Sequence, residues 1–340
     1  MTPNLRRIVL ARRPDGLPSP EDFRLETAPI PDPGEGEVLV EVLWLSLDPY
    51  MRGRMDDARS YAQAVAIGGK MEGGAVGRVI ASRDAAFVPG DHVMGPFGWA
   101  SHAVARGREV RRLDPDAAPL STALGVLGMP GFTGWHGLHA YGRPQKGETL
   151  VVAAATGPVG SMVGQLAQAA GLRVVGIAGG PDKCRLATQL FGFDACLDHR
   201  AYPDAKSLRE ALGTACPQGI DVYFENVGGV VLDAVLPLMN VGGRIPVCGM
   251  IAWYNAGGLG ANAGGTRDLL PRTWRTILVN RLSVTGFIIS DHWGRLPEFL
   301  ADVAPRVAAG EIAYLEDVAE GLEAAPEAFI GMLQGRNRGK

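Results

Sequence analysis

The sequence predicts an α/β protein of two domains, a β-rich domain followed by one with a doubly wound parallel sheet. Three observations support this prediction. Short apolar runs separated by Pro and Gly turns fill the chain up to about residue 125. From about residue 148, strands and helices alternate. A glycine motif lies between the first strand and the first helix of that alternating half, where a nucleotide-binding loop is expected.

The first half is predicted to form strands joined by tight turns. Glu37–Leu45 is rich in Val and Leu and follows a Pro/Gly turn. Gly74–Ala81 and Asp91–Met94 are further strand candidates, and Phe87–Gly90 makes the turn between them. No long helical pattern interrupts these segments, so we expect a small β-rich domain.

The second half is predicted to form βαβ units. Its strands are expected at 149–154, 173–178, 194–197, 220–224, 243–248 and 282–289. Its helices are expected at about 158–171, from 181 to about 192, and near Leu232–Met239. The glycine-rich segment Asn255–Gly265 is predicted to be a mobile loop. After residue 295 we expect a helix, a short strand and a second helix at Ala325–Leu333.

Composition and charge exclude several classes of protein. With 46% hydrophobic and 20% charged residues, the chain has the composition of an ordinary globular protein. Its net charge of -3 offers no basic field for nucleic acid. No apolar run is long enough for a signal peptide or a membrane helix. We therefore expect a cytoplasmic protein with neither a nucleic-acid nor a membrane partner.

The cysteines and histidines do not predict a metal site. The four cysteines are widely spaced, form no CxxC pair and begin only at Cys184. Histidines occur in the first half, but without the spacing that would bring three metal ligands together. We expect neither a disulfide framework nor a bound metal.

The strongest chemical signal is the segment Ala154–Gly164, AATGPVGSMVG. Gly157 is expected to permit a tight turn and close approach of the backbone to a pyrophosphate, and Gly160 to let the helix pack on the strand. Pro158 and Val159 complete the first turn, where free N–H groups would face the phosphates. The motif is A-x-x-G-x-x-G rather than G-x-G-x-x-G, so a plain glycine-rich turn is the alternative.

The second strand of this half predicts which nicotinamide cofactor binds. An NAD site places Asp or Glu at the end of that strand, to bind the ribose 2′-hydroxyl. Here the strand ends Ala178-Gly179-Gly180, and Lys183 follows. The glycines leave room for a 2′-phosphate that the Lys183 ammonium can bind, which favours NADP(H). An ordinary exposed helix lysine is the alternative for Lys183.

Several longer segments resemble the medium-chain dehydrogenase/reductases, and within them the zinc-free alkenal/one reductases, which include leukotriene/prostaglandin reductases and bacterial curcumin reductases. The matching segments cover nearly the whole chain: SLDPYMRGRM, GMPGFTGWHGL, FENVGG, PVCGMIAWYN, GFII and the C-terminal GLEAAPEAFIGMLQGRNRGK. AGGPDKCRLATQLFGFDACLDH (178–199) is most similar to the curcumin-reductase branch.

The resemblance implies a GroES-like catalytic domain of residues 1–125 with 311–340, and a Rossmann NADP-binding domain of residues 126–310. It also implies that His199 lies beside the 2′-phosphate, where a cationic imidazole would make affinity sensitive to pH. The remaining cofactor contacts that it implies are Met129, Thr133, Asn226, Cys248, Gly249, Met250, Ile251, Tyr254, Phe287, Ile288, Ile289 and Asn337.

The resemblance further implies NADPH-dependent reduction of the C=C bond of an α,β-unsaturated ketone or aldehyde, by hydride transfer to the β-carbon without a metal. Tyr254 matches the family's candidate proton donor, and an unperturbed phenol is protonated at neutral pH. Tyr50, in DPYMRGR, is a candidate donor on the substrate side, with Met51 and Arg52 beside the nicotinamide end. A packed tyrosine is the alternative at both positions, and solvent could deliver the proton.

Two other functions fit the same residues. A quinone reductase would use the same metal-free fold and the same hydride delivery. A non-catalytic NADPH-binding protein would need neither tyrosine. Family resemblance also implies a homodimer, which could pair the strands at Leu282–Ile289 edge to edge.

Overall fold

The computed structural model of the protein describes residues 4–58, 60–257 and 270–340. These residues fall into two units. The first contains 4–125, 254–257 and 318–337, and the second contains 126–253, 270–317 and 338–340. The predicted loop Asn255–Gly265 lies outside the described residues from position 258 onward.

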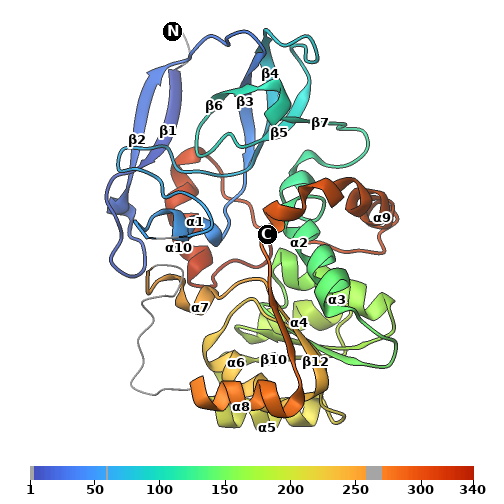
Figure 1. Cartoon of the computed structure of the whole chain (residues 1–340). Helices are drawn as coiled ribbons and strands as arrows, with labels where there is room; N and C mark the ends of the chain where they lie inside the picture. The colour runs from blue at the N-terminus through green and yellow to red at the C-terminus, as the bar shows by residue number, and fades with distance from the viewer. Residues whose placement is uncertain (1–3, 59, 258–269) are drawn as a thin grey trace. The chain divides into compact units, whose positions relative to one another are not determined.

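The first unit is built on antiparallel strands (Figure 1). Its five-stranded sheet has the order β6-β3-β4-β5-β7, and β1 pairs with β2 in a separate two-stranded sheet. The strands are β1 (Asn4–Leu10), β2 (Phe23–Pro29), β3 (Glu37–Leu45), β4 (Ala75–Ser82), β5 (His92–Gly95), β6 (His102–Arg106) and β7 (Arg111–Leu113). The predicted strands Glu37–Leu45, Gly74–Ala81 and Asp91–Met94 are confirmed as β3, β4 and β5.

The C-terminal helix α10 (Ala325–Leu333) completes the core of this unit. The rings of Phe23 and Trp99 stack with centroids 5.5 Å apart, and the Phe329 ring meets Trp99 edge-on at the same distance. Aromatic pairs of this geometry add to the free energy of burial alone. The helix predicted at Ala325–Leu333 is thus confirmed, and its apolar face packs among strands that precede it by about 300 residues.

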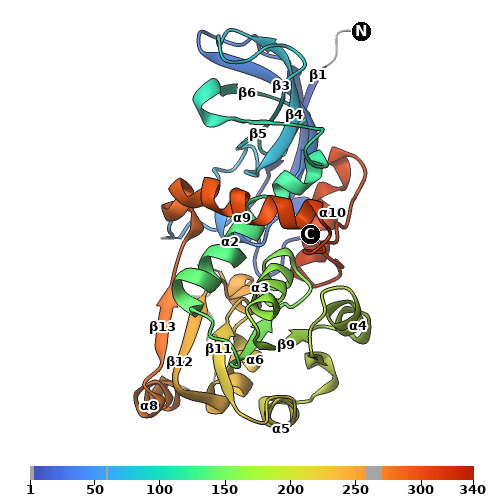
Figure 2. The ribbon, with the colours of Figure 1, turned by 90° about the vertical axis from the view of Figure 1, so that its right-hand side faces the viewer.

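The second unit contains a six-stranded parallel sheet of order β10-β9-β8-β11-β12-β13. Figure 2 shows β11, β12 and β13 of this sheet side by side. The strands are β8 (Thr149–Ala153), β9 (Arg173–Ala178), β10 (Ala195–Asp198), β11 (Ile220–Phe224), β12 (Met239–Val247) and β13 (Ser283–Gly286). Numbered within the unit, this is the order 3-2-1-4-5-6 of a Rossmann sheet. The chain adds strands on one side from β8 to β10 and on the other side from β11 to β13, so the order reverses between β8 and β11.

Helices cover both faces of this sheet. Leu208 and Leu212 of α5 (Ala205–Ala215) and Val231 of α6 (Gly229–Val235) form one core with Val151 and Val175 of the strands. The neighbouring strand residues point to the opposite face, which α3 (Pro158–Ala169) covers. Both faces are therefore buried, as the continuous apolar runs of the strands predict.

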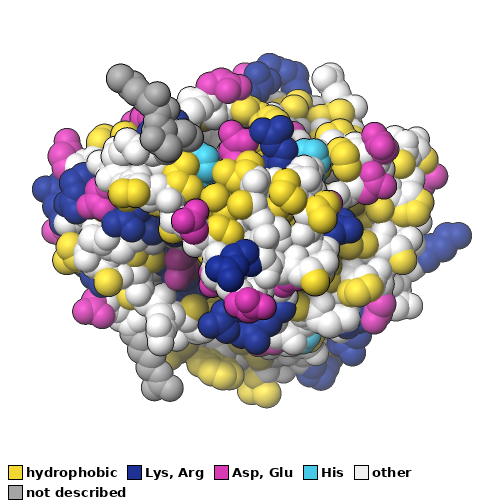
Figure 3. Space-filling model, turned by 90° about the horizontal axis from the view of Figure 1, so that it is seen from above, with side chains coloured by type: hydrophobic (Ala, Val, Ile, Leu, Met, Phe, Trp, Pro, Cys, Tyr) yellow, Lys and Arg dark blue, Asp and Glu magenta, His cyan; other side chains and the backbone are white. Residues whose placement is uncertain are grey.

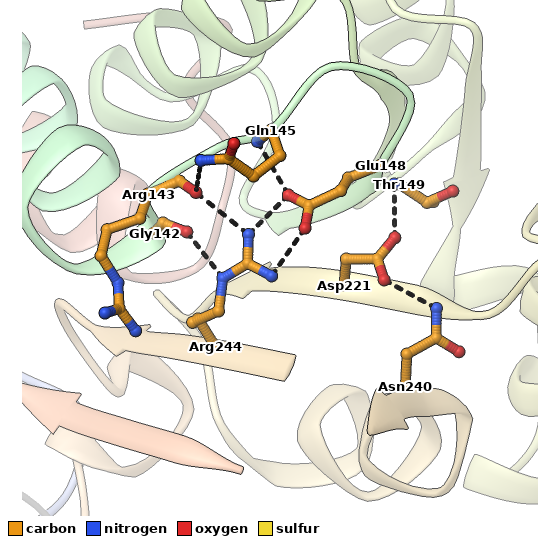
Figure 4. Close-up of polar contacts among 8 residues, drawn as sticks. All are labelled: Gly142, Arg143, Gln145, Glu148, Thr149, Asp221, Asn240 and Arg244. Carbon is orange, nitrogen blue, oxygen red and sulfur yellow. Dashed lines mark hydrogen bonds and ion pairs between the residues drawn. The ribbon is translucent and has the colours of Figure 1, made fainter. Parts of the chain in front are cut away.

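The amino ends of the central strands are tied together by polar contacts (Figure 4). The Arg244 guanidinium on β12 bonds Glu148 at 2.8 Å and the carbonyl oxygen of Gly142 at 3.0 Å. The Asp221 carboxylate of β11 accepts the Thr149 N–H and the Asn240 amide, both at 2.8 Å. These contacts fix the relative positions of β8, β11 and β12 at the edge opposite to their carboxyl ends.

Three predicted boundaries differ from the structure. The helix expected near Leu232–Met239 ends earlier, because α6 stops at Val235 and Met239 begins β12. The strand expected at Leu282–Ile289 is reduced to Ser283–Gly286, since a 3-10 turn begins at Ile289. The short strand expected between α9 (Leu296–Ala308) and α10 does not form, because residues 311–321 pair with no strand.

Five of the described α-helices were not predicted: the short α1 (Tyr50–Arg54) and α7 (Ile251–Tyr254), and the longer α2 (Met129–Gly137), α5 and α8 (Leu270–Asn280). Three glycines in α2 conceal its helical pattern, although close packing requires them there. A Cβ on Gly131 would lie 2.1 Å from the Val126 carbonyl oxygen, and one on Gly137 would lie 2.6 Å from the Phe287 ring. The Asp204 cap of α5, whose carboxylate accepts the Ser207 N–H at 2.8 Å, was a usable signal in the sequence.

The C-terminal segment is divided between the units. Residues 318–337 belong to the first unit, whereas 311–340 were expected there. The last residues return to the second unit because Lys340 donates its N–H to Leu315 and accepts one from Asp317, at 2.9 and 2.7 Å. The assignment of catalytic and cofactor-binding roles to the two domains stays a prediction.

We expect Gly164→Ala to lower the thermal unfolding midpoint by several degrees, because an added Cβ in α3 would lie 2.0 Å from the Phe193 ring. Overpacking of this kind costs about 1–3 kcal/mol. Gly213→Ala is the matched control, since the nearest atom is 3.9 Å from its added Cβ and alanine favours a helix by up to about 1 kcal/mol. Equal midpoints for the two variants would contradict the packing argument.

Candidate functional site

The order of the parallel sheet locates a candidate site at the carboxyl ends of β8 and β11, where the strand order reverses. In open α/β sheets, ligands bind in the crevice outside the carboxyl ends of the strands at this point. The loop from Ala154 to Gly157 leaves β8 there and leads directly into α3.

The glycine motif makes this turn, although a different residue adopts the unusual backbone conformation. Ala154 is left-handed, with φ of 54°, whereas Gly157 has φ of -68°, which any residue can adopt. The tight turn therefore does not depend on Gly157 as we expected. A Cβ on Gly160 would lie 2.3 Å from the Ala154 carbonyl oxygen, so the predicted packing of helix on strand at Gly160 is confirmed.

The first turn of α3 has the properties of an anion site. No side chain among the described residues caps it, and Pro158 at its start has no N–H to leave unpaired. Ser161 is the first residue whose N–H bonds back to Gly157, at 2.9 Å. The N–H groups of Val159 and Gly160 precede this bond, as orphan donors at a helix N-terminus do. These groups and the helix dipole fit a pyrophosphate.

The loops after β11 and β12 run beside each other at the same edge of the sheet. Asn226 donates its side-chain amide to the Ala153 carbonyl oxygen at 2.9 Å, which joins the ends of β11 and β8. Cys248 and Gly249 donate their N–H groups to the backbone carbonyl oxygen of Glu225, and Ile251 donates its N–H to that of Asn226. The segments ENVGG and PVCGMI, matched by resemblance, are thus neighbours in space.

The buried carboxylate of Glu225 orders the loop after β11 and was not singled out from the sequence. One of its oxygens accepts the N–H groups of Val227 and Gly228, at 2.6 and 2.8 Å. Burial raises the pKa of Glu225, although these N–H groups oppose the shift. Burial, with help from Glu225, also raises the pKa of the Cys248 thiol to about 12, which disfavours the thiolate form.

A cluster of basic side chains lies at the carboxyl ends of β9 and β10. Arg200 Nε and His199 Nε2 lie 3.0 and 3.1 Å from the point where a Cβ on Gly179 would be. The Asp198 carboxylate orders this corner by accepting the N–H groups of Gly180 and Arg200, at 2.7 and 3.0 Å. Gly180, at φ of 105°, gives α4 (Pro181–Gln189) its start beside these side chains.

Lys183 in the first turn of α4 shares the electrostatic environment of this cluster. Burial lowers the pKa of Lys183, Arg200 lowers it further, and Asp317 opposes them. Its ammonium therefore lies in the electrostatic field of Arg200, and cations of this kind suit a phosphate. We name Lys183, His199 and Arg200 the basic cluster. Arg200 was missed in the sequence, although it directly follows His199.

The charge of His199 is set by its surroundings in the fold. Burial lowers its pKa below the ordinary value of 6.5, and Arg200 and Lys183 lower it further against the opposing effect of Asp198. The imidazole is therefore mostly neutral at pH 7 when no phosphate is present. It can still donate a hydrogen bond from one ring nitrogen.

The other predicted contacts in the second unit lie on α2 and after β13. Thr133 donates its hydroxyl to the Met129 carbonyl oxygen at 2.7 Å, within the first turn of α2. The Phe287 ring is buried and lies 5.2 Å from that of Tyr141, so it packs into the interior. Ile288 and Ile289, which follow it, are half-buried.

Three predicted residues belong to the first unit: Tyr50, Tyr254 and Asn337. Tyr50 begins α1 (Tyr50–Arg54), and burial raises the pKa of its phenol well above 10, with Asp48 and Glu72 adding to the effect. Its neighbour Arg52 is 1% exposed and binds Asp56 at 2.6 Å, so Arg52 is a structural residue rather than a contact at a ligand.

The described residues contain no group of three or more His, Cys, Asp or Glu side chains arranged to hold a metal ion. None of the helices described is long and apolar enough to cross a membrane. The face of the molecule in Figure 3 carries basic and acidic side chains interspersed, with hydrophobic ones between them, rather than a field of one sign.

Comparison with known proteins gives consistent matches. Residues 6–113 match a family described as the N-terminal domain of oxidoreductase, and residues 158–304 match one described as zinc-binding dehydrogenase. The NADPH-dependent curcumin reductase of Escherichia coli is 51% identical over 98% of this chain and 95% of its own. The NADP-dependent 2-alkenal reductase of Nicotiana tabacum is 39% identical over 98% and 96%. The crystal structure of CurA from Vibrio vulnificus in complex with NADPH superimposes with a TM-score of 0.92, at 49% identity over 98% and 97%.

We expect Lys183→Ala and Arg200→Ala each to raise KM for NADPH about 10- to 100-fold, since a hydrogen bond to a charged group contributes about 1.5–3 kcal/mol. KM for NADH should change by no more than about two-fold, because NADH has no 2′-phosphate. Initial rates with each cofactor measure this. Arg185→Ala in the same helix is the control, because Arg185 is exposed and pairs with Asp182. An equal loss with both cofactors would contradict the assignment.

Proposed function

We infer the function of this chain from the family it belongs to, the alkenal/one reductases of the medium-chain dehydrogenase/reductase superfamily, which include prostaglandin and curcumin reductases. The protein is an NADPH-dependent reductase of the C=C bond in α,β-unsaturated ketones and aldehydes. The observation that carries this proposal is 51% identity to a curcumin reductase along 98% of the chain, joined to a basic cluster suited to NADPH.

The described residues fit the cofactor at two points. The uncapped first turn of α3 offers the N–H groups of Val159 and Gly160 to the pyrophosphate. The basic cluster offers Lys183, His199 and Arg200 to the 2′-phosphate, and the small Gly179 leaves them room. The β9 strand ends in Ala178-Gly179-Gly180, so the strand itself carries no carboxylate where an NAD site has the acid that binds the 2′-hydroxyl.

NADPH supplies the hydride when it is bound. The protein must then hold the substrate carbonyl, whose oxygen gains negative charge, and deliver a proton to the α-carbon. We assign Tyr254 as the group that donates the proton and stabilises the charge on the oxygen. Tyr50 is assigned a supporting hydrogen bond, which it donates from the substrate side. The raised pKa of Tyr50 supports this role, because its phenol stays protonated at every physiological pH and can donate a hydrogen bond.

We expect purified protein to oxidise NADPH in the presence of curcumin and of a simple enone such as 3-nonen-2-one, with mass spectrometry showing two hydrogens added across the C=C bond. A quinone, tested as the competing substrate, should turn over more slowly. Turnover of the quinone alone would replace this proposal with a quinone reductase. Tight NADPH binding without turnover of any substrate would indicate a non-catalytic NADPH-binding protein.

The same assay separates the roles of the two tyrosines. Tyr254→Phe should lower kcat by about 10- to 100-fold, toward the low end of the range for general acid catalysis, because water can replace the phenol in part. Tyr50→Phe should mainly raise KM for the enone. Tyr314→Phe, on a partly exposed tyrosine of the second unit, is the control and should match the wild type. Unchanged kcat in Tyr254→Phe would assign the proton to solvent.

We also propose a homodimer, formed through the β13 edge of the sheet. β13 is the last strand of its sheet, and Val284 on it is exposed. Leu270, Trp274 and Leu278 are exposed at four-residue spacing on α8, which precedes β13. A free strand edge beside an exposed apolar stripe is suited to pairing with a second copy.

We expect Val284→Lys combined with Leu278→Asp to convert the dimer into a monomer, because charges at a strand edge oppose pairing. Light scattering after size-exclusion chromatography measures the mass. Val88→Lys, at an exposed valine in a turn of the first unit, is the control and should leave the dimer intact. A wild-type protein that elutes as a monomer would refute the proposal.

A further inference from the structure

Two cysteine thiols are in contact next to the basic cluster. Cys184 lies in the first turn of α4, Cys196 lies on β10, and their sulfur atoms are 3.1 Å apart. A disulfide requires about 2.05 Å between the sulfurs, so a movement of about 1 Å would close the bond. Twelve residues separate the two positions along the chain, and only the fold brings them together.

The surroundings of the pair permit this movement and the entry of an oxidant. Both thiols are partly exposed, whereas Cys216 is buried. Cys196 packs over Gly176 of β9, where an added Cβ would lie 3.2 Å from its sulfur. Glycine at position 176 therefore avoids the crowding that a side chain would impose on the Cys196 sulfur.

The two thiols are not equivalent. The Cys196 thiol donates a hydrogen bond to the Cys184 sulfur. That bond lowers the pKa of Cys184, against the opposing effects of burial and Asp198, and raises the pKa of Cys196. A thiolate is the form that reacts with oxidants, so Cys184 is the attacking sulfur and Cys196 the resolving one.

We propose that Cys184 and Cys196 form a reversible disulfide when the protein meets hydrogen peroxide, and that this bond weakens the binding of NADPH. The Cys184 thiolate takes one oxygen from peroxide and becomes a sulfenic acid, with release of hydroxide. The Cys196 sulfur then displaces that oxygen as water, so two thiols lose two electrons and peroxide gains them. A dithiol reductant reverses the bond.

The coupling to the cofactor follows from chain connectivity and rests on the proposed function. Lys183 directly precedes Cys184, and Asp198, which orders His199 and Arg200, follows Cys196 by two residues. Drawing the sulfurs together moves the first turn of α4 relative to the end of β10. Hydrogen bonds to a phosphate depend steeply on such positions. The disulfide should therefore affect the ribose 2′-phosphate more than the rest of the dinucleotide.

The bond itself is tested by peptide mapping after treatment of the full-length protein with hydrogen peroxide and alkylation of the remaining thiols. Trypsin cleaves after Lys183, Arg185 and Arg200, so the disulfide would join the dipeptide Cys184-Arg185 to the peptide Leu186–Arg200. We expect this linked pair, which disappears when dithiothreitol is added. Cys184→Ser and Cys196→Ser should each abolish it, and Cys216→Ala should not. Peroxide treatment that leaves both thiols free, or oxidises Cys184 without linkage, overturns the proposal.

The effect on the cofactor is tested by direct binding, without any substrate. Oxidised wild-type protein should bind NADPH roughly five-fold more weakly than reduced protein, as expected for loosening one of several charge-assisted bonds. Binding of NADH should change by less than about two-fold. Both serine variants should be insensitive to peroxide. A disulfide that leaves NADPH binding unchanged, or weakens NADH equally, overturns the coupling. Failure of reduced protein to bind NADPH would instead contradict the proposed function, and the peptide map would still decide on the disulfide.

Discussion

The contact between Gly160 and the Ala154 carbonyl is the constraint from which the site is built. Any side chain at position 160 would push α3 away from the end of β8, since even a Cβ would lie 2.3 Å from that oxygen. The close approach fixes where the first turn of α3 begins, and hence where its free N–H groups lie. It also explains why Ala154 adopts a left-handed conformation, because the chain must turn within a few residues between strand and helix.

The two edges of the parallel sheet have opposite properties. At the amino ends, Arg244 pairs with Glu148 and Asp221 accepts two donors, so polar groups satisfy one another (Figure 4). At the carboxyl ends, the uncapped first turn of α3 leaves N–H donors available, and glycines lie beside basic side chains. A sheet rigid at one edge can hold loops at the other in the arrangement that a ligand needs. Glu225 extends this order into the loop after β11 by accepting two of its N–H groups.

Much of the second unit could be predicted because its strands are buried on both faces and therefore read as continuous apolar runs. The ends of β9 and β11 follow directly from such runs. The helix α2 could not, since tertiary packing demands glycine at Gly131 and Gly137, and glycine removes the pattern that marks a helix. Lys183 was found from the missing acid after β9, which is a local signal. Arg200 was missed because only the pairing of β9 with β10 brings it beside Gly179. The charge of His199 depends on burial, which the sequence alone does not state.

The basic cluster gives a physical reason for selecting a phosphorylated dinucleotide. Arg200 lowers the pKa of both Lys183 and His199, and Lys183 lowers that of His199, so in the free protein Lys183 and Arg200 repel each other and disfavour a proton on His199. A dianionic phosphate placed among them gains their attraction and also removes part of that repulsion. A dinucleotide without the phosphate leaves this repulsion in place. Burying the two cations beneath such a ligand, with no anion beside them, costs additional free energy. Selectivity therefore comes from the state of the free protein as much as from contacts in the complex. A small displacement within the cluster changes both the attraction to the phosphate and the repulsion between the cations.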